Sequence, residues 1–317
     1  MAQESSTADR TESSTSERNT VLTRRSYVQS IIAGAATRLG ITAGGVTKVG
    51  MTVVGALTAE EYEVLKADGQ MVRIGEGETF ENTLIDLTRG RSFTLVVNGG
   101  GSVIRNIGFK GLCRGSGFQI LVTASSGEVI VENLYLGDGA TKKGSGHEYG
   151  PGAIFCNNEG DSDVTFRYCN VQGYPNSGFY CSDTGDSGSV TFENCYGKNN
   201  GVATFHCAGP DDSLRNCVGY NDDTDYGPGY DGFTERNGYP VWVGSSGPVT
   251  IENSHFAAGA YPETLRTHGD GSIDFESGSY SGTFRGAVRT GTVATDPNLS
   301  IPEGVPKSAE EAAIEST

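Results

Sequence analysis

A short phrase recurs along most of the chain, and it constrains the fold more than any other feature. Each copy contains a Gly or Ser turn, then a strand of alternating apolar and polar residues, then usually an Asn. The copies are GSVIRNIGF (101–109), GEVIVENLYL (127–136), SDVTFRYCNV (162–171), GSVTFENCYG (188–197), DSLRNCVG (212–219), GPVTIENSHF (247–256) and GSIDFESGSY (271–280). A repeat separated by loops of varying length indicates stacked structural units.

The turn residue gives the spacing of the units. Asn106, Asn133, Tyr168, Asn194, Asn216, Asn253 and Ser277 are taken as equivalent, which gives intervals of 27, 35, 26, 22, 37 and 24 residues. A second strand lies between these phrases, as in GFQILVT (117–123) and ATFHCAG (203–209), and a third short strand follows the turn. Units of ~25 residues with three short strands predict an all-β right-handed parallel β-helix with coils about 4.8 Å apart. The Asn column is expected to turn the chain in the left-handed region and to stack its amides.

The segments outside the repeats predict the domain organisation. Residues 1–50 are expected to form a disordered tail with an export signal, 51–70 a linker and capping helix, 71–290 the β-helix, and 291–317 a C-terminal tail with some helix. The capping helix is predicted over 58–67 (TAEEYEVLKA), because Thr58 and Glu61 have the spacing of a capping box. Such a helix would cover the unpaired edge of the first coil.

The N-terminal tail contains a candidate export signal. Arg24 and Arg25 precede a short apolar run of small residues, which resembles a twin-arginine signal and predicts an extracellular or cell-surface location. The alternative is a polar tail with an irregular entry segment, because Arg38 interrupts the run. No run approaches the ~20 apolar residues of a transmembrane helix.

The net charge of −16 limits the partners of the chain. This negative charge argues against nucleic acid and anionic membranes as partners, because binding to either requires basic patches. Lysine is scarce, and an acidic, lysine-poor surface resembles that of proteins from high-salt environments.

The seven cysteines are predicted to be buried thiols. Strand alternation places Cys156, Cys181 and Cys207 in one inward column. Cys169, Cys195 and Cys217 form another, and Cys113 stands alone. Other units carry Val, Ile or Leu at these positions, so small buried fillers are favoured over disulfides and over a zinc site, for which CxxC pairs are absent.

Two outward columns accompany the inward ones. Beside the Asn column, Arg and Glu alternate over successive units, which predicts an ion ladder at Arg105, Glu132, Arg167, Glu193, Arg215, Glu252 and Glu276. On the other strand, the outward column contains Leu121, Phe155, Tyr180, His206, Trp242 and Arg266. Rings spaced along a groove suit sugar rings, so Phe155, Tyr180, His206, Trp242 and Arg266 are the predicted polysaccharide-binding residues. The alternative is that the long preceding loops bury the rings as ordinary packing.

The order of strand, short Asn turn, strand, long loop and strand resembles the pectin-lyase-like β-helix superfamily. The run GAIFCNNEGDSDVTFRYCNVQGYPNSGFYCSDTGDSGSVTFENC (152–195) is similar to exported haloarchaeal right-handed β-helix proteins. The resemblance covers about residues 70–290 and implies a ligand groove along the sheet that follows the long loops. Within that superfamily, lyases combine Ca²⁺-binding acids with an Arg or Lys base, and hydrolases use grouped Asp residues, often with a His.

Candidates for such chemistry are present without the spacing of a complete site. The catalytic candidates are Asp222, Asp223, His206, Arg266 and His268. A Ca²⁺ loop is a further candidate, with Asp222, Asp223, Asp225 and Asp231 as ligands, although the EF-hand pattern is absent. Acid clusters on an acidic protein are more often solvated surface.

Three functions therefore remain open. The favoured one is an exported β-helix that binds a polysaccharide or surface glycan without cleaving it. The alternatives are a polysaccharide lyase or glycoside hydrolase acting in the same groove, and a purely structural or virion-associated β-helix. No cofactor other than Ca²⁺ is indicated, and the oligomeric state is left open.

Overall fold

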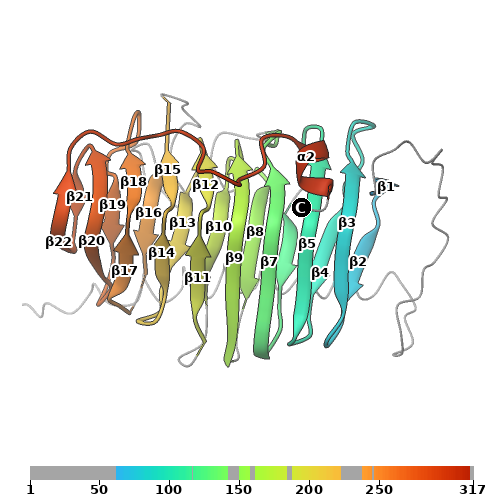
Figure 1. Ribbon diagram of the computed structural model, residues 1–317, viewed down its shortest axis with the longest axis horizontal. Coiled ribbons are helices and arrows are strands. Elements are labelled where there is room, and N and C mark those ends of the chain that lie inside the picture. The colour runs from blue at the N-terminus through green and yellow to red at the C-terminus, as the bar shows by residue number, and fades with distance from the viewer. Residues whose placement is uncertain are drawn as a thin grey trace, which may run out of the picture. The chain divides into compact units, whose positions relative to one another are not determined.

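The protein is a parallel β-helix, as the repeats predict. The computed structural model describes residues 62–314 apart from residues 116, 142–149, 158–160, 184–187, 223–237 and 245. Within these residues, nearly every strand belongs to one of two large parallel sheets (Figure 1). Successive coils stack along the long axis because each strand pairs with its equivalents in the coils before and after it.

The larger sheet, sheet A, holds the strands on both sides of the Asn column. Its strands before and after the turn merge into one sheet because β3, β5, β7, β9 and β20 continue across the turn. The described members are β1 (Glu63–Lys66), β3 (Thr79–Asp86), β5 (Ser102–Lys110), β7 (Ser126–Leu136), β9 (Asp161–Gln172), β11 (Val190–Glu193), β12 (Tyr196–Lys198), β14 (Ser213–Arg215), β15 (Val218–Tyr220), β17 (Val249–Glu252), β18 (Ser254–Ala257), β20 (Ser272–Ser281) and β22 (Ala287–Ala294).

The smaller sheet, sheet B, holds the second strand of each unit. Its described members are β2 (Met71–Ile74), β4 (Thr94–Val97), β6 (Phe118–Val122), β8 (Gly152–Asn157), β10 (Ser177–Asp183), β13 (Ala203–Cys207), β16 (Tyr239–Val243), β19 (Leu265–Thr267) and β21 (Phe284–Arg285). Each coil therefore contributes a strand to sheet B and one strand on either side of the turn in sheet A, as predicted.

The turn residues adopt the left-handed backbone that was predicted for them. Their φ angles are 49° to 56° at Asn82, Asn106, Asn133, Tyr168, Asn194 and Asn216, and 46° at Asn253. Ser277 differs, since the positive φ lies at the next residue, Gly278. The amides stack where the column is buried, because Asn133 donates to Asn106 and Asn106 donates to Asn82. Asn216 and Asn253 are exposed, so the column is not buried along its whole length.

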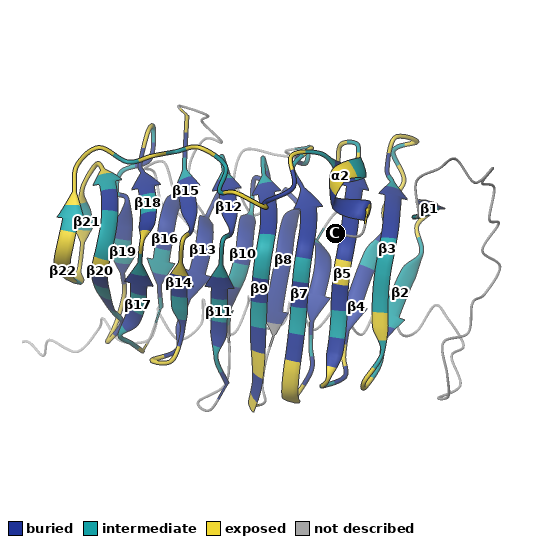
Figure 2. Ribbon diagram, in the orientation of Figure 1, coloured by how far each residue is buried: buried dark blue, intermediate teal, exposed yellow. Residues whose placement is uncertain are grey.

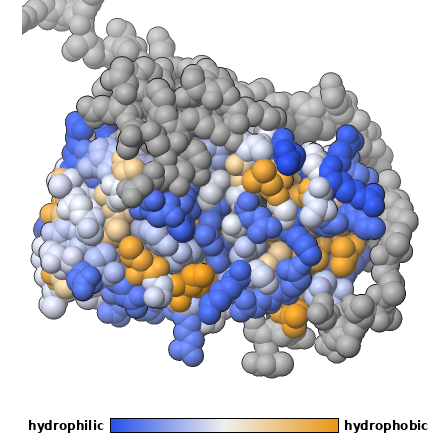
Figure 3. Space-filling model, turned by 90° about the horizontal axis from the view of Figure 1, so that it is seen from above, coloured by the Kyte–Doolittle hydropathy of each residue, from blue (hydrophilic) through white to orange (hydrophobic). Residues whose placement is uncertain are grey.

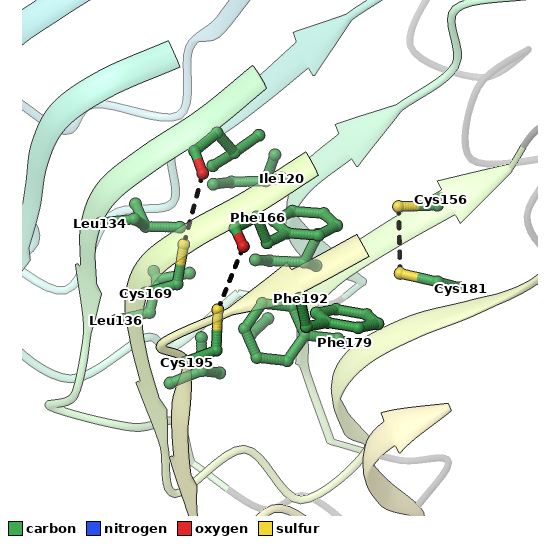
Figure 4. Packing of buried hydrophobic residues seen from close by; sticks show 14 of the residues in the cluster. Ile120, Leu134, Leu136, Cys156, Phe166, Cys169, Phe179, Cys181, Phe192 and Cys195 are labelled. Atoms are coloured by element: carbon green, nitrogen blue, oxygen red, sulfur yellow. Dashed lines mark hydrogen bonds between the residues drawn. The ribbon is translucent and has the colours of Figure 1, made fainter. Parts of the chain in front are cut away.

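The interior is filled by columns of apolar side chains from equivalent positions. Phe166 stacks on Phe192 with centroids 5.4 Å apart, and Phe179 stacks on Phe205 at 5.3 Å. All seven cysteines are free and buried, as predicted. The Sγ atoms of Cys156 and Cys181 lie 3.1 Å apart, and Figure 4 shows the two cysteine columns on different sides of the Phe stack. Burial raises the pKa of the Cys181 thiol well above its usual value, which fits a packing role.

The predicted N-terminal helix over 58–67 is not observed. Glu63–Lys66 forms β1, which pairs in parallel with residues 83–86 of β3, and residues 58–61 lie outside the described part. The helical pattern of TAEEYEVLKA is overridden because β3 offers a row of backbone partners and the interior takes up Leu65 and Ala67. The β-helix therefore begins before Met71.

The C-terminal segment runs back along sheet A towards the first coils (Figure 1). We call residues 295–314 the C-terminal strap. It ends in the short helix α2 (Ala309–Ala313), which Ser308 caps by accepting a hydrogen bond from the Glu311 amide. The Pro306 carbonyl accepts from Asn170, and the Ala312 carbonyl accepts from Asn133. The strap therefore covers apolar and polar positions that the repeat exposes on the outer face of sheet A.

The alternating charges of sheet A form the predicted ion ladder over much of its length. Strand pairing aligns Glu81 with Arg105, Arg105 with Glu132, and Glu193 with Arg215. Arg167 lies between two carboxylates, at 3.7 Å from Glu132 and 3.0 Å from Glu193. These pairs are partly exposed, so they fix register more than they add stability.

The visible surface is mainly hydrophilic. Seen from above, the hydrophobic residues lie in separate patches between polar ones (Figure 3). Among the described residues, no helix is long and apolar enough to cross a membrane.

Candidate functional site

The outward column of sheet B has the predicted register. Pairing aligns Leu121 with Phe155, Phe155 with Tyr180, and Tyr180 with His206. The column continues from His206 to Trp242 and from Trp242 to Arg266. The sequence therefore placed every one of these residues on the correct strand and in the correct order.

The rings of the column pack on one another. Phe155 and Tyr180 stack with centroids 5.2 Å apart and planes 23° apart, and His206 and Trp242 stack at 4.5 Å and 12°. Between these pairs, Tyr180 meets His206 edge to face at 4.8 Å. Stacking follows from the strand spacing, because flat rings at equivalent positions of adjacent strands are about 4.8 Å apart. The ring faces thus engage each other, which argues against an open platform for sugar rings.

Burial of the column agrees with this geometry. Phe155 and His206 are each 4% exposed, whereas Tyr180, Trp242 and Arg266 are half-buried. Phe118 adds a further ring, 5.2 Å from Phe155. Phe155 and His206 are therefore packing, and Tyr180, Trp242 and Arg266 are the members of the aromatic column that solvent reaches.

The Trp242 end of the column is a compact polar and aromatic cluster. The guanidinium of Arg266 lies 4.9 Å from the centroid of Tyr239 and 5.7 Å from that of Trp242, and it donates to the Tyr239 hydroxyl. The Tyr239 ring also meets Trp242 edge to face at 5.5 Å. Burial raises the pKa of Tyr239, and the Arg266 guanidinium opposes part of this rise, so the hydroxyl is protonated at neutral pH.

Two more charged residues complete the cluster. Arg285 is the strand partner of Arg266, and its guanidinium lies 3.7 Å from the Glu263 carboxylate. We refer to Tyr239, Trp242, Glu263, Arg266 and Arg285 as the Trp242 cluster. The two Arg and one Glu give the Trp242 cluster a net charge of +1, whereas the net charge of the whole chain is −16.

Two polar atoms of the Trp242 cluster are buried and have no hydrogen-bond partner in the described part of the chain. They are the indole Nε1 of Trp242, which can only donate, and the carboxylate Oε2 of Glu263, which can only accept when ionised. Buried polar groups are almost always paired in folded proteins, so unpaired ones require an explanation. A ligand with hydroxyl groups can accept from the indole and donate to the carboxylate.

The catalytic candidates are placed on two different sheets. His206, Arg266 and His268 lie in or directly after strands of sheet B, and His268 is exposed in the turn after β19. Asp222 follows β15 of sheet A, where it is 2.6 Å from the Lys198 ammonium and accepts from the Asn199 amide. Asp223 lies outside the described residues.

Of the four predicted Ca²⁺ ligands, Asp222 lies in the described part of the chain. Asp222 is engaged as above, and Asp223, Asp225 and Asp231 lie outside the described residues. Within the described ranges, no group of three or more His, Cys, Asp and Glu side chains could hold a metal ion.

Sequence reasoning missed the residues that surround the column. Tyr239 contacts Trp242 and Arg266, and Glu263 contacts Arg285, but both residues precede the predicted column positions and lie outside the period-two pattern of the column. A signal for Glu263 was its position three residues before Arg266, at the end of a long loop. Asp212, in the turn before β14, is buried and accepts from the backbone amides of Val190, Ala208 and Gly209.

Comparison of the chain with protein-family models, with curated proteins and with solved structures finds no match.

Proposed function

We propose that this protein is a non-catalytic β-helix that binds an acidic polysaccharide at the Trp242 cluster. The observation that supports this proposal is that two buried atoms of opposite character, the donor Trp242 Nε1 and the acceptor Glu263 Oε2, have no hydrogen-bond partner in the described part of the chain. The hydroxyl groups of a sugar both donate and accept, so they can supply the partner that each of the two atoms lacks.

The charge of the cluster supports an acidic ligand. Arg266 and Arg285 are adjacent, and only Glu263 offsets them within the cluster. In the described part of the chain, the partners of the Arg266 guanidinium are the Tyr239 hydroxyl and two ring faces, which are neutral and leave its charge available to a carboxylate or sulfate. On a chain of net charge −16, a local excess of positive charge is the position where an anionic polymer can approach.

This proposal changes the role first predicted for the aromatic residues. Stacked rings cannot also stack on sugars, so recognition here depends on hydrogen bonds and charge. Phe155 and Tyr180 then act as a packed base that holds His206 and Trp242 in place.

An enzymatic role is supported less well. Glycoside hydrolysis uses two carboxyl groups about 5–10 Å apart. Glu263 is the one carboxylate that we identify at the cluster in the described part of the chain. A structural role without a ligand is the second candidate, and the observation in its favour is the stacked, largely buried column. Export by the Arg24 and Arg25 signal stays a prediction, because these residues lie outside the described part.

The test is a binding and cleavage assay on one set of oligosaccharides. Hexuronate, sulfated and neutral oligomers are titrated by calorimetry, and reducing ends are measured after incubation. We expect saturable binding of an acidic oligomer without new reducing ends. Binding of no oligomer supports the structural candidate, and new reducing ends support the enzyme.

Two variants that each keep an aromatic side chain and lose one polar hydrogen locate the site. Trp242→Phe removes the indole N–H and should weaken binding by ~1 kcal/mol, about fivefold. Tyr180→Phe removes a hydroxyl elsewhere in the column and should leave the affinity unchanged. An equal loss of affinity in both variants would indicate that the ligand binds along the whole aromatic column rather than at the Trp242 cluster.

A further inference from the structure

One pair of cysteines lies closer together than the regular spacing of the coils. Cys156 lies in β8, and Cys181 lies in β10 of the next coil. Their Sγ atoms are 3.1 Å apart, and a dashed line marks this contact in Figure 4. Equivalent atoms of neighbouring strands in a regular sheet are about 4.8 Å apart. The two sulfur atoms are therefore closer than regular stacking alone would place them.

A bulge in β10 accounts for the short distance. The register of β10 against β8 shifts by one residue between Tyr180 and Asp183, so Cys181 and Ser182 together lie opposite Cys156. A bulge of this kind bends the strand and turns its side chains to new directions. The close approach of the two thiols thus follows from the backbone at this position.

The thiols of the other cysteine column are engaged differently. Each donates to a backbone carbonyl of the preceding coil, at 3.4–3.6 Å: Cys169 to Val131, Cys195 to Phe166 and Cys217 to Phe192. In the first column, pairing is regular at Cys207, which lies beside Val243. Cys156 and Cys181 instead direct sulfur at sulfur.

We propose that Cys156 and Cys181 form a disulfide when the chain folds in the presence of a disulfide oxidant such as oxidised glutathione. One cysteine thiolate attacks the oxidant and a glutathione thiolate leaves, which gives a mixed disulfide. The second cysteine thiolate then attacks the sulfur of the first, and the other glutathione thiolate leaves. The two cysteines lose two electrons, the oxidant gains them, and the two thiol protons pass to the released glutathione thiolates.

Burial determines when this bond can form. The described residues of β8, β10 and β13 are mainly buried (Figure 2), and both thiols are fully enclosed. Burial raises the pKa of the Cys181 thiol well above its usual value, and the thiolate is the form that reacts. The folded, reduced protein should therefore resist the oxidant, whereas the folding chain should react with it.

The bond would join the two strands that carry the stacked rings of the aromatic column. Cys156 follows Phe155 and Cys181 follows Tyr180, and these rings stack with centroids 5.2 Å apart. The two cysteines are 25 residues apart in the chain. Closing a loop of that length constrains the unfolded state and should raise Tm by roughly 5–10 °C.

Peptide mapping tests the pair directly. The full chain is refolded from urea with oxidised glutathione, the remaining thiols are alkylated, and the digest is analysed by mass spectrometry. We expect one linked pair of peptides, containing Cys156 and Cys181, and alkylation of the other five of the seven cysteines. The folded, reduced protein should show no linked pair with the same oxidant. The proposal is overturned if both cysteines are alkylated after refolding, or if other pairs are linked as often.

Two variants separate this pair from the rest of its column. Cys156→Val and Cys207→Val each introduce the residue that a neighbouring coil carries at the same position, Val122 and Val243. Refolding with the oxidant should raise the Tm of the wild type and of Cys207→Val, and it should leave the Tm of Cys156→Val unchanged. An equal rise in Cys156→Val, or no rise in the wild type, would contradict the proposed bond.

Discussion

The C-terminal strap joins parts of the solenoid that the repeat itself leaves unconnected, and Gly108→Ala tests what it contributes. In a solenoid each coil contacts only its neighbours, so stability is nearly a sum of local terms. The strap leaves the last coil at β22 and places α2 on β5 and β7. Gly108 lies under α2, and a Cβ at this position would overlap the carbonyl oxygen of Ala309. The substitution should therefore displace the helix.

The contacts of α2 give the expected magnitude. Displacement loses the hydrogen bond from Asn133 to the Ala312 carbonyl, worth ~1 kcal/mol, and leaves that amide unpaired. Ala309, Ala312 and Ala313 lose burial at ~0.8 kcal/mol for each methyl group. The partly exposed pair of Lys110 and Glu310 adds about 0–1 kcal/mol. The free energy of unfolding should fall by about 3–4 kcal/mol.

Two assays follow the strap and the fold separately. Urea denaturation gives the change in stability, and trypsin cleavage after Lys307, which is exposed in the strap, reports its detachment. Gly244→Ala is the matched control, because its Cβ would meet Ala208 at an ordinary 3.6 Å. If Gly108→Ala is as stable and as resistant to trypsin as Gly244→Ala, the strap is not a stabilising element.

Three further outcomes are expected. Asn133→Ala should destabilise the protein by ~1–2 kcal/mol more than Asn253→Ala in urea denaturation, because both lose a left-handed Asn but only Asn133 is buried and bonded to two partners; equal losses would refute a role for the buried amides. Arg167→Gln should cost about 0–1 kcal/mol at low salt and nothing at ~1 M salt, where charges are screened beyond ~3 Å; a loss that persists in salt would point to packing. Burial raises the pKa of Asp212 to about 6, so the native state holds a proton that the unfolded chain releases; stability measured by urea denaturation should fall by up to ~3 kcal/mol as pH rises from about 4 to about 6, and Asp212→Asn should abolish this slope. An unchanged slope in that variant would assign the pH dependence to other groups.

The repeat made the fold predictable, because a period-two pattern with an Asn at each turn leaves few architectures that bury every apolar column. The inward cysteines and the outward ladder followed from strand alternation alone. The prediction of an N-terminal helix was wrong because it rested on local spacing alone. TAEEYEVLKA has helical spacing, but Glu63–Lys66 pairs with β3, and no local sequence pattern reveals this partner strand.

The candidate site was predictable in register and less so in chemistry. Alternation placed Trp242 and Arg266 on one outward column, but it could not show that the rings stack on each other, since this depends on side-chain rotamers and coil spacing. Tyr239 and Glu263 approach the column from a strand start and a loop end, where the period-two pattern gives no direction. The C-terminal strap does not contain the repeat, so the sequence predicted only a tail with some helix and not its path along sheet A.

Fluorescence of Trp242 tests the proposed function most directly, because it is the one tryptophan in the chain. An acidic hexuronate oligomer is titrated into the full chain while indole emission is recorded. The account predicts a saturable change in the wild type, with the midpoint about 10–100-fold higher in Arg266→Gln, since a charge-assisted hydrogen bond is lost. Arg215→Gln, which removes a cation from the sheet A ladder, should keep the wild-type midpoint. No change in emission, or an equal shift in Arg215→Gln, would contradict binding at the Trp242 cluster.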